Sequence, residues 1–276
     1  MLAIVDADLL LYRIGHTTNT EPEWVAKHRC NEMIETILAE TGADEYQLWL
    51  SDSRENNFRF KLWNGYKANR KDVVKPVHFD FLKEYLILEW GAMIAHDMEA
   101  DDACGISQED DTVIVSIDKD LKMIPGLHYN FVKKEFDTIT PQQGLINFYT
   151  QFLVGDASDK IRGCTGIGPV KARKAFEEFG ECPTEGQLLD CIYELYKKQE
   201  DRKSTQEIIE HLLLIGRLLK IRTAEDEPLW RFPKSKVMED YLALSIHQEQ
   251  GEIIQSTEPI RQAASGFQSD GLPMAT

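Results

Sequence analysis

Acidic side chains follow three predicted strands at the point where each strand ends. With one further acid two positions downstream, they are Asp6, Asp52, Asp118 and Asp120. The carboxyl ends of parallel strands meet at one edge of a sheet, where ligand sites form. Asp118 and Asp120 would face the same way if strand geometry continued through them. The sequence therefore predicts a group of carboxylates at one edge of a sheet.

Two other segments add acids to this set. At the start of a predicted helix, Glu99 and Asp102 share one face while Asp101 projects about 100° away. Asp156 and Asp159 follow a later helical pattern. Taken alone, each acid has an ordinary structural explanation, because aspartate caps helices and acids stabilise helix N-termini. Only the complete set points to chemistry.

Up to nine carboxylates meeting at one edge would repel one another and become protonated unless cations neutralised them. Oxygen ligands without histidine or cysteine select hard ions such as Mg²⁺ or Mn²⁺. An acidic pocket of this kind can hold two ions roughly 3.5–4 Å apart, the spacing that clamps a phosphodiester for hydrolysis. We therefore predict a site for two divalent metal ions.

A glycine-rich turn follows the last acids. Gly163, Gly166 and Gly168 permit tight turning, and a proline then begins a helix. Free N–H groups at such a helix start bind phosphate oxygens without recognising base sequence. Lys171 and Lys174 lie on an exposed face of the predicted helix. A turn between two helices with no ligand is the alternative, but the lysines and adjacent acids favour phosphate binding.

Residues 58–71 interleave aromatic and basic side chains. Aromatic rings stack on bases while cations meet the phosphates, a pattern typical of proteins that hold single-stranded ends. The alternative is an amphipathic helix with buried aromatic rings, which we favour for Phe58 and Phe60. For Tyr66, Lys67 and Arg70 we favour binding.

The elements that must position these residues change in type along the chain. Strands are predicted at 2–5, 46–50, 112–117 and 128–132. Helices are predicted at 23–40, 77–90, 98–107, 141–153, 169–179, 186–199, 203–222 and 235–247. Strands alternating with helices predict an α/β domain with a mainly parallel sheet over 1–155. An all-α part over 156–247 and a flexible tail over 248–276 complete the expected organisation.

Composition limits the classes of protein that fit. The net charge of −16 looks unfavourable for a nucleic-acid partner, but residues 54–75 and 160–174 each carry a local charge of +5. Two basic segments on an acidic body suit a protein that contacts phosphates at chosen places. No apolar run approaches the roughly 18 residues of a spanning helix, and no secretory signal is evident. Five cysteines without a C-x-x-C pair indicate free thiols, so we expect a cytoplasmic protein.

The acids and the glycine turn resemble, in order, the signature of the 5′ nucleases, the superfamily of flap endonucleases and 5′→3′ exonucleases. The resemblance covers roughly residues 1–180, and the segment 66–76 is most similar to the replication exonucleases of short-tailed phages. It implies a PIN-like nuclease core, an arch-like segment over 54–75 and a helix–hairpin–helix element in the helical lobe. The implied activity is hydrolysis of phosphodiester bonds near the 5′ ends of duplex or flap DNA, or of RNA–DNA hybrid during primer removal.

The resemblance also implies roles for individual residues. The implied metal ligands are Asp6, Asp52, Glu99, Asp101, Asp102, Asp118, Asp120, Asp156 and Asp159. Lys67 and Arg70 would contact the scissile phosphate, and Tyr66 would stack near the first base. The glycine hairpin would hold duplex DNA and bind K⁺, in a protein that acts as a monomer in the cytoplasm of the host cell. Asp8 departs from the usual pattern and has no implied role.

Two other functions are compatible with parts of the sequence. A phosphatase of the haloacid-dehalogenase type would use Asp6 and Asp8 as nucleophile and acid, but it leaves the acids at 99–102 and the hairpin unexplained. A non-catalytic binder of DNA junctions would gain nothing from a pocket that repels DNA. Turnover of small phosphoesters would favour the first, and tight binding without Mg²⁺-dependent cutting the second.

Overall fold

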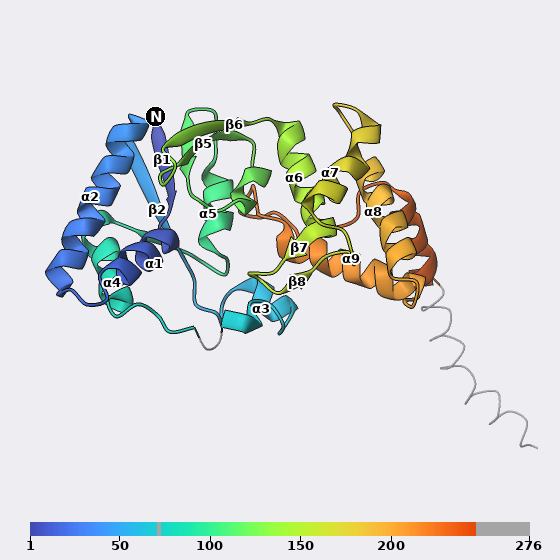
Figure 1. Ribbon diagram of the computed structural model, residues 1–276, viewed down its shortest axis with the longest axis horizontal. Helices are drawn as coiled ribbons and strands as arrows, with labels where there is room; N and C mark the ends of the chain where they lie inside the picture. The colour runs from blue at the N-terminus through green and yellow to red at the C-terminus, as the bar shows by residue number, and fades with distance from the viewer. Residues whose placement is uncertain (71–72, 247–276) are drawn as a thin grey trace, which may run out of the picture.

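A six-stranded sheet forms the centre of the N-terminal half in the computed structural model, which describes residues 1–70 and 73–246 (Figure 1). The strand order is β3-β2-β1-β4-β5-β6, parallel except for β6, which runs antiparallel to β5. The strands are β1 (Leu2–Asp6), β2 (Glu45–Ser51), β3 (Met93–Ala95), β4 (Thr112–Val115), β5 (Gly126–Asn130) and β6 (Glu135–Ile139). The predicted α/β fold class with a mainly parallel sheet is confirmed.

The two central strands are apolar on both faces. In β4 every residue is buried, and in β1 only Leu2 retains partial exposure. The four predicted strands are present, whereas the edge strands β3 and β6 were missed. β6 has four exposed residues out of five and β3 has only three residues, so neither carries the apolar run that marks a buried strand.

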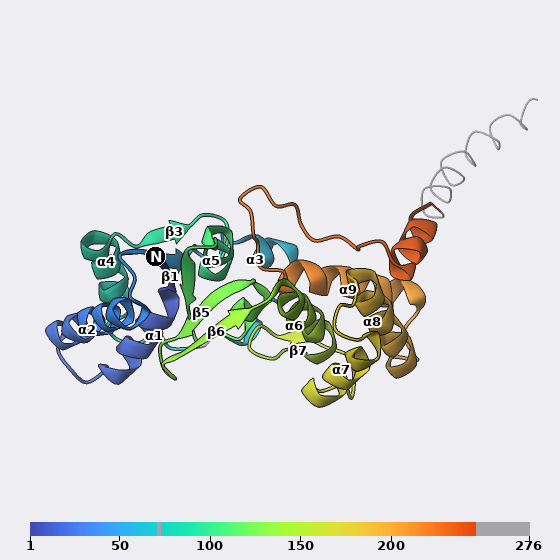
Figure 2. The ribbon, with the colours of Figure 1, turned by 90° about the horizontal axis from the view of Figure 1, so that it is seen from above.

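Helices cover one face of the sheet. They are α1 (Asp8–Thr17), α2 (Glu23–Thr41) and α4 (Phe79–Trp90). Their apolar side chains pack on alternate strand residues such as Ala3 and Val5. Figure 2 shows these helices together at one end of the molecule. Helix α1 was not predicted; it begins at Asp8, two residues after the end of β1.

The other face packs on α5 (Ala100–Ser107) and on the helical lobe, with Ile4 and Ile114 joining the lobe's core. The lobe contains α6 (Pro141–Val154), α7 (Pro169–Phe176), α8 (Glu185–Gln199), α9 (Thr205–Leu219) and a helical segment over 236–246. Capping boxes at Thr140, Thr184 and Ser204 fix the starts of α6, α8 and α9. One core therefore runs from the sheet into the helices.

Short elements connect these layers. They are α3 (Phe58–Leu62), β7 (Gly155–Asp156), β8 (Ile161–Arg162) and the 3₁₀ turns η1 (Ala68–Arg70), η2 (Asp120–Met123) and η3 (Glu177–Phe179). All five cysteines are free. Among the described residues, no helix combines the length and apolar character needed to cross a membrane. The tail predicted over 248–276 lies outside the described residues.

Candidate active site

A small acidic pocket lies where β1 and β4 end. It has a volume of about 130 Å³, and seven acidic and two basic side chains are among its lining residues. The acids are Asp6, Asp8, Glu99, Asp101, Asp118, Asp120 and Asp159. Lys67 and Arg70 are the basic residues. Six residues predicted as metal ligands are thus brought together from segments spread over more than 150 positions.

Asp6 lies deepest in this pocket. It ends β1, is only 4 % exposed, and its Oδ1 atom has no hydrogen-bond partner among the described residues. Burial, followed by repulsion from Asp8 and Asp118, raises the pKa of Asp6 well above its usual range. Burial likewise raises the pKa of Asp101, with repulsion from Asp6 and Asp118 adding to it. A bound cation would relieve the cost of burying these two carboxylates and their repulsion, because the oxygen would coordinate the cation and the positive charge would offset the negative charges.

Asp118 and Asp120 follow β4 and are held by a local turn. The N–H of Asp120 donates to Asp118 Oδ1 at 2.9 Å. Lys119, between them, reaches away to place its Nζ atom 2.7 Å from Asp120 Oδ1 and 2.9 Å from Asp156 Oδ2. Burial and the charge of Asp118 raise the pKa of Asp120 to about 7. Asp156 is therefore linked to the pocket through Lys119, although it does not belong to the pocket lining in the described structure.

Glu99 and Asp159 meet the basic segment. Lys67 forms ion pairs with Glu99 and, at 3.6 Å, with Asp159. Arg70 Nη2 lies 2.8 Å from Asp159 Oδ1. Burial works to raise the pKa of Glu99, but Lys67 and Arg59 outweigh it and lower the pKa. The basic side chains expected at the scissile phosphate thus lie beside the acids.

Tyr66 has a different position from the one its expected role requires. Its side chain is only 1 % exposed, and its ring packs edge-on against Phe60. The hydroxyl oxygen lies 2.7 Å from Glu99 Oε2 and 2.9 Å from Asp159 Oδ2, and its single proton is shared between these carboxylates. A ring enclosed in this way offers no face to a DNA base. In this structure the Tyr66 ring packs against Phe60 and its hydroxyl contacts the two carboxylates, so stacking on a base would require the side chain to move; the stacking role stays a prediction.

Asp52 and Asp102, also expected as metal ligands, do not line the pocket in the described structure. Asp52 accepts hydrogen bonds from Ser53 N (2.6 Å) and Asp97 N (3.0 Å), so it stabilises the turn after β2. Asp102 is fully buried and pairs with Arg59 through contacts of 2.5 and 2.8 Å. Both carboxylates are already satisfied by hydrogen-bond donors. Both make structural contacts in this structure, and their role as metal ligands stays a prediction.

Asp8 and Ser51 line the pocket although neither had a predicted role. Asp8, at the start of α1, accepts hydrogen bonds from Ser51 N at 3.3 Å, and burial raises its pKa. Ser51 itself lines the pocket and accepts a hydrogen bond from Ala100 N at 2.9 Å through its hydroxyl. The position of Ser51 at the end of a predicted strand was the feature of the sequence that could have placed it at the pocket.

The donor chemistry of the pocket fits hard divalent ions, which prefer carboxylate oxygens. Within residues 1–70 and 73–246, however, no three His, Cys, Asp or Glu side chains are arranged closely enough to form a finished metal site. Lys67, Arg70 and Lys119 lie among the carboxylates instead. Metal binding at this pocket therefore requires side-chain rearrangement around the fixed backbone of the strand ends.

The glycine turn lies next to the acidic pocket in sequence and is rigidly built. A Cβ atom on Gly163 would lie 2.4 Å from the carbonyl oxygen of Leu153, and Gly166 has a φ of +74°. Neither position accommodates a larger residue without strain. The turn leads into α7, whose N-cap makes no side-chain hydrogen bond. The β7–β8 pair, rather than a helix, directly precedes the turn.

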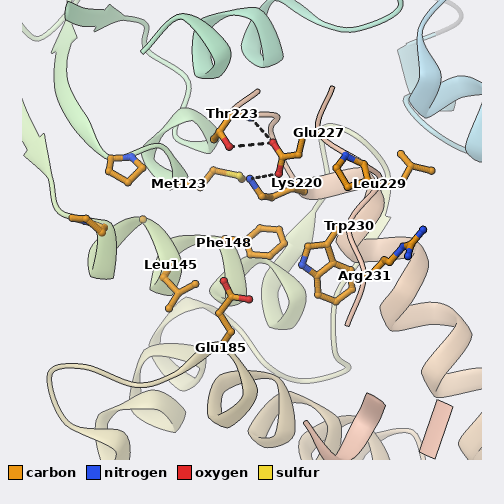
Figure 3. A pocket seen from close by; sticks show the side chains of 14 residues that line it. Met123, Leu145, Phe148, Glu185, Lys220, Thr223, Glu227, Leu229, Trp230 and Arg231 are labelled. Carbon is orange, nitrogen blue, oxygen red and sulfur yellow. Dashed lines mark hydrogen bonds and ion pairs between the residues drawn. The ribbon is translucent and has the colours of Figure 1, made fainter. Parts of the chain in front are cut away.

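A second, larger pocket of about 670 Å³ lies between α6 and the segment 220–231 (Figure 3). Phe148 and Trp230 form part of its wall, and its acids are engaged: Glu227 pairs with Lys220 at 3.3 Å, and Glu185 accepts from Tyr149 at 3.4 Å. Glu185 and Glu227 are its only acidic lining residues among the described residues, against seven in the first pocket. The chemistry indicated by the sequence is located at the smaller pocket.

Proteins of known sequence are similar to this chain. DNA polymerase I of Rhizobium leguminosarum is 29 % identical over 198 residues, which are 64 % of this chain and 19 % of that protein. Flap endonuclease Xni of Colwellia psychrerythraea is 27 % identical over 194 residues, 62 % of this chain and 65 % of that protein. The chain thus spans less than two thirds of the length of each of these relatives.

Solved structures share the fold. T5 5′-exonuclease with bound zinc superposes with a TM-score of 0.56 and 19 % identity, covering 78 % of this chain and 88 % of that one. The bacteriophage T5 flap endonuclease in complex with DNA and metal ions gives 0.54 and 17 %, covering 79 % and 94 %. The family model described as "5'-3' exonuclease, N-terminal resolvase-like domain" matches residues 1–148. The resemblance to the 5′ nucleases is therefore confirmed, and the chain belongs to the 5′–3′ exonuclease family that carries this resolvase-like domain.

Proposed function

We propose that this protein is a divalent-metal-dependent 5′ nuclease. It hydrolyses phosphodiester bonds near the 5′ ends of duplex or flap DNA, and of RNA–DNA hybrid, during DNA replication. The observation that carries this proposal is the buried Asp6 carboxylate, which lines a pocket with six further acids and whose Oδ1 has no hydrogen-bond partner within residues 1–70 and 73–246. Family membership and the names of the relatives, which include a flap endonuclease, support the same activity.

Two divalent ions, Mg²⁺ or Mn²⁺, are the proposed cofactors. The ligands that the pocket favours are Asp6, Glu99, Asp101, Asp118, Asp120 and Asp159, with Asp156 reached through rotation of Lys119. Such ions generate a hydroxide nucleophile and stabilise the departing oxygen. The metal ions in the solved T5 complex support this choice of cofactor class.

The protein's own residues orient the reacting groups. Tyr66 holds Glu99 and Asp159 in place through its hydroxyl, so these carboxylates are aligned before substrate arrives. Lys67 and Arg70 lie at the rim with their cationic groups beside the acids. A scissile phosphate entering here would take over these cations, which then offset the charge that develops on it during hydrolysis. Asp8 keeps its position by accepting from Ser51.

The glycine turn is the proposed duplex contact, in the role of the family's helix–hairpin–helix element. Its N–H groups and the uncapped start of α7 suit a phosphate, with Lys171 and Lys174 nearby in sequence. A K⁺ ion at this hairpin is the finer part of the proposal. It must compete with Lys171, whose Nζ atom lies 2.8 Å from the Gly166 carbonyl oxygen. The protein is proposed to act as a monomer in the cytoplasm.

One assay tests the activity. Duplex, flap and hybrid substrates labelled at the 5′ or 3′ end are incubated with protein in Mg²⁺, in Mn²⁺ and in chelator. We expect metal-dependent release of short products from 5′ ends, abolished in Asp118→Asn and Asp120→Asn variants that still bind DNA. If both variants cut normally, or if the native protein leaves every substrate intact, the proposal is wrong. Turnover of small phosphoesters alone would indicate the phosphatase instead.

A further inference from the structure

Glu200, outside the acidic pocket, gathers an unusual number of donors. It stands at the C-cap of α8 and is 9 % exposed. Its carboxylate accepts hydrogen bonds from the Thr165 hydroxyl, from Thr165 N at 3.3 Å and from Arg162 Nη2 at 3.1 Å. Lys203 adds an ion pair at 3.5 Å. Glu200 thus holds the segment 162–165 through the Thr165 backbone N–H, the Thr165 hydroxyl and the Arg162 guanidinium.

The segment it holds is the glycine turn. Thr165 lies inside that turn, immediately before Gly166. On the other side, Gly163 packs so closely against the end of α6 that a Cβ atom would overlap the Val154 carbonyl carbon at 2.4 Å. The turn is therefore fixed at two points, by backbone contact with α6 and by the carboxylate of Glu200 from α8.

This anchoring bears on phosphate binding. A phosphate is bound well only when several N–H groups already point to one place, since ordering them at the moment of binding lowers affinity. Glu200 engages the N–H of Thr165, and Ile167 N donates to the Cys164 carbonyl oxygen at 3.2 Å, so the backbone that leads into the start of α7 is fixed from both sides, while no side chain caps that helix start. Arg162, 64 % exposed, is held beside this backbone by the same carboxylate.

We propose that Glu200 is a positioning residue for DNA binding: it presets the glycine turn, and with it Arg162, for a phosphate of the duplex. This inference rests on the proposed function, because it concerns the same substrate. Glu200 does not touch the reacting atoms and lies outside the acidic pocket. It acts through Thr165 and Arg162.

The sign of the expected effect distinguishes this role from simple electrostatics. Removing a negative charge near a DNA-binding surface strengthens DNA binding when charge alone matters. A positioning role predicts the opposite, because the turn loses its anchor. We expect Glu200→Ala to raise the dissociation constant for duplex DNA and the KM for cleavage about tenfold, with kcat unchanged. Glu200→Gln keeps one acceptor oxygen and should raise both about threefold.

Glu194→Gln is the matched control. Glu194 belongs to the same helix α8 and forms ion pairs with Lys236 (2.9 Å) and Lys197 (3.2 Å), but it is far more exposed. Its replacement removes the same charge without touching the turn. We expect unchanged or slightly tighter DNA binding. Fluorescence anisotropy in chelator measures binding, and steady-state cleavage in Mg²⁺ measures KM and kcat separately.

A double-mutant cycle gives a second test of the contact between Glu200 and Thr165. Thr165→Val removes the hydroxyl that donates to Glu200. The losses of affinity from Thr165→Val and Glu200→Ala should not add, because they break the same contact. Additive losses, a Glu200→Ala protein that binds DNA as well as Glu194→Gln, or a fall in kcat at unchanged KM would overturn the inference. If the native protein neither binds nor cuts DNA, the proposed function itself fails.

Discussion

Asp101 and Asp102 are neighbours on α5, yet they belong to two regions with opposite electrostatics. Asp101 lines the pocket, where burial and repulsion from Asp6 and Asp118 raise its pKa well above the usual range. Asp102 lies in a buried joint, where Arg59 Nη1 approaches it to 2.5 Å and Arg222 N donates to it at 3.1 Å. Among the described residues no ion pair offsets the negative charge of Asp101, whereas Arg59 offsets that of Asp102.

The joint has a structural task that the pocket lacks. Arg59, from the basic segment, also donates to the carbonyl oxygens of Leu218 (2.8 Å) and Lys220 (2.9 Å) at the end of α9. It thus ties the basic segment and the sheet domain to the helical lobe. A buried pair of this kind is balanced, and it is costly to break because one charge would remain unpaired. Uncompensated negative charge marks the place that a cation would stabilise, and the paired charges of Arg59 and Asp102 mark a structural contact.

The sharpest test of this comparison replaces each aspartate by asparagine. Asp101→Asn should lower the rate of DNA cleavage at least about a thousandfold, roughly 4 kcal/mol of transition-state stabilisation, because a metal ligand is lost. Its free energy of unfolding without added metal should stay the same or rise, since a repelled charge is removed. Cleavage assays and urea denaturation measure both. Asp80→Asn, at an exposed site, is the control, and near-native cleavage by Asp101→Asn would show that the imbalance has no catalytic meaning.

Asp102→Asn should reverse this pattern. We expect a loss of about 3 kcal/mol in the free energy of unfolding, because Arg59 keeps its buried charge without a partner. The fraction that stays folded should still bind metal ions with native stoichiometry, measured by calorimetry. Asp97→Asn serves as control, since its ion pair with Lys61 at 3.4 Å is exposed. Loss of metal binding at unchanged stability would restore Asp102 to the ligand set.

Tyr66→Phe separates two roles for the tyrosine. The variant keeps an aromatic ring for stacking but loses the hydroxyl that contacts Glu99 and Asp159. We expect cleavage to fall about thirtyfold, close to 2 kcal/mol, because these bonds go to charged acceptors. The dissociation constant for DNA should change little. Native activity in the phenylalanine variant would instead favour the stacking role for which the sequence argued.

These contrasts explain how far the sequence could be interpreted. Two of the three acids at strand ends, Asp6 and Asp118, line the pocket, because strand direction decides where they lie, whereas Asp52 does not. The partners of individual side chains could not be predicted from the sequence. No local pattern shows that Arg59 pairs with Asp102, 43 positions away, or that the Tyr66 side chain is buried. Edge strands such as β6, largely exposed, carried too little apolar signal. Long-range pairing of charges decides which acids are free, and spacing does not reveal it.

The smallest expected effect concerns pH, and it follows from Asp120. Burial raises its pKa to about 7 in the folded protein, against 3.8 for an ordinary aspartate. The folded state therefore binds more protons than the unfolded state between these values, so stability without metal falls as pH rises through about 7. From pH 6 to pH 8 we expect a loss of roughly 1 kcal/mol, a few degrees in Tm.

Asp120→Asn isolates this contribution, because other titrating groups are common to both proteins. The buried His128 and the half-buried His211 have lowered pKa values and act in the opposite direction, destabilising the fold as pH drops below about 6.5. Thermal denaturation of native protein and variant across this range gives the difference directly. Added Mg²⁺ should invert the native slope, since ions bind the deprotonated carboxylates and stabilise the fold more as pH rises. If Tm depends on pH in the same way for the native protein and the variant, with and without Mg²⁺, the charge of Asp120 is as well balanced as that of Asp102. The contrast between the pocket and the buried joint would then not include Asp120.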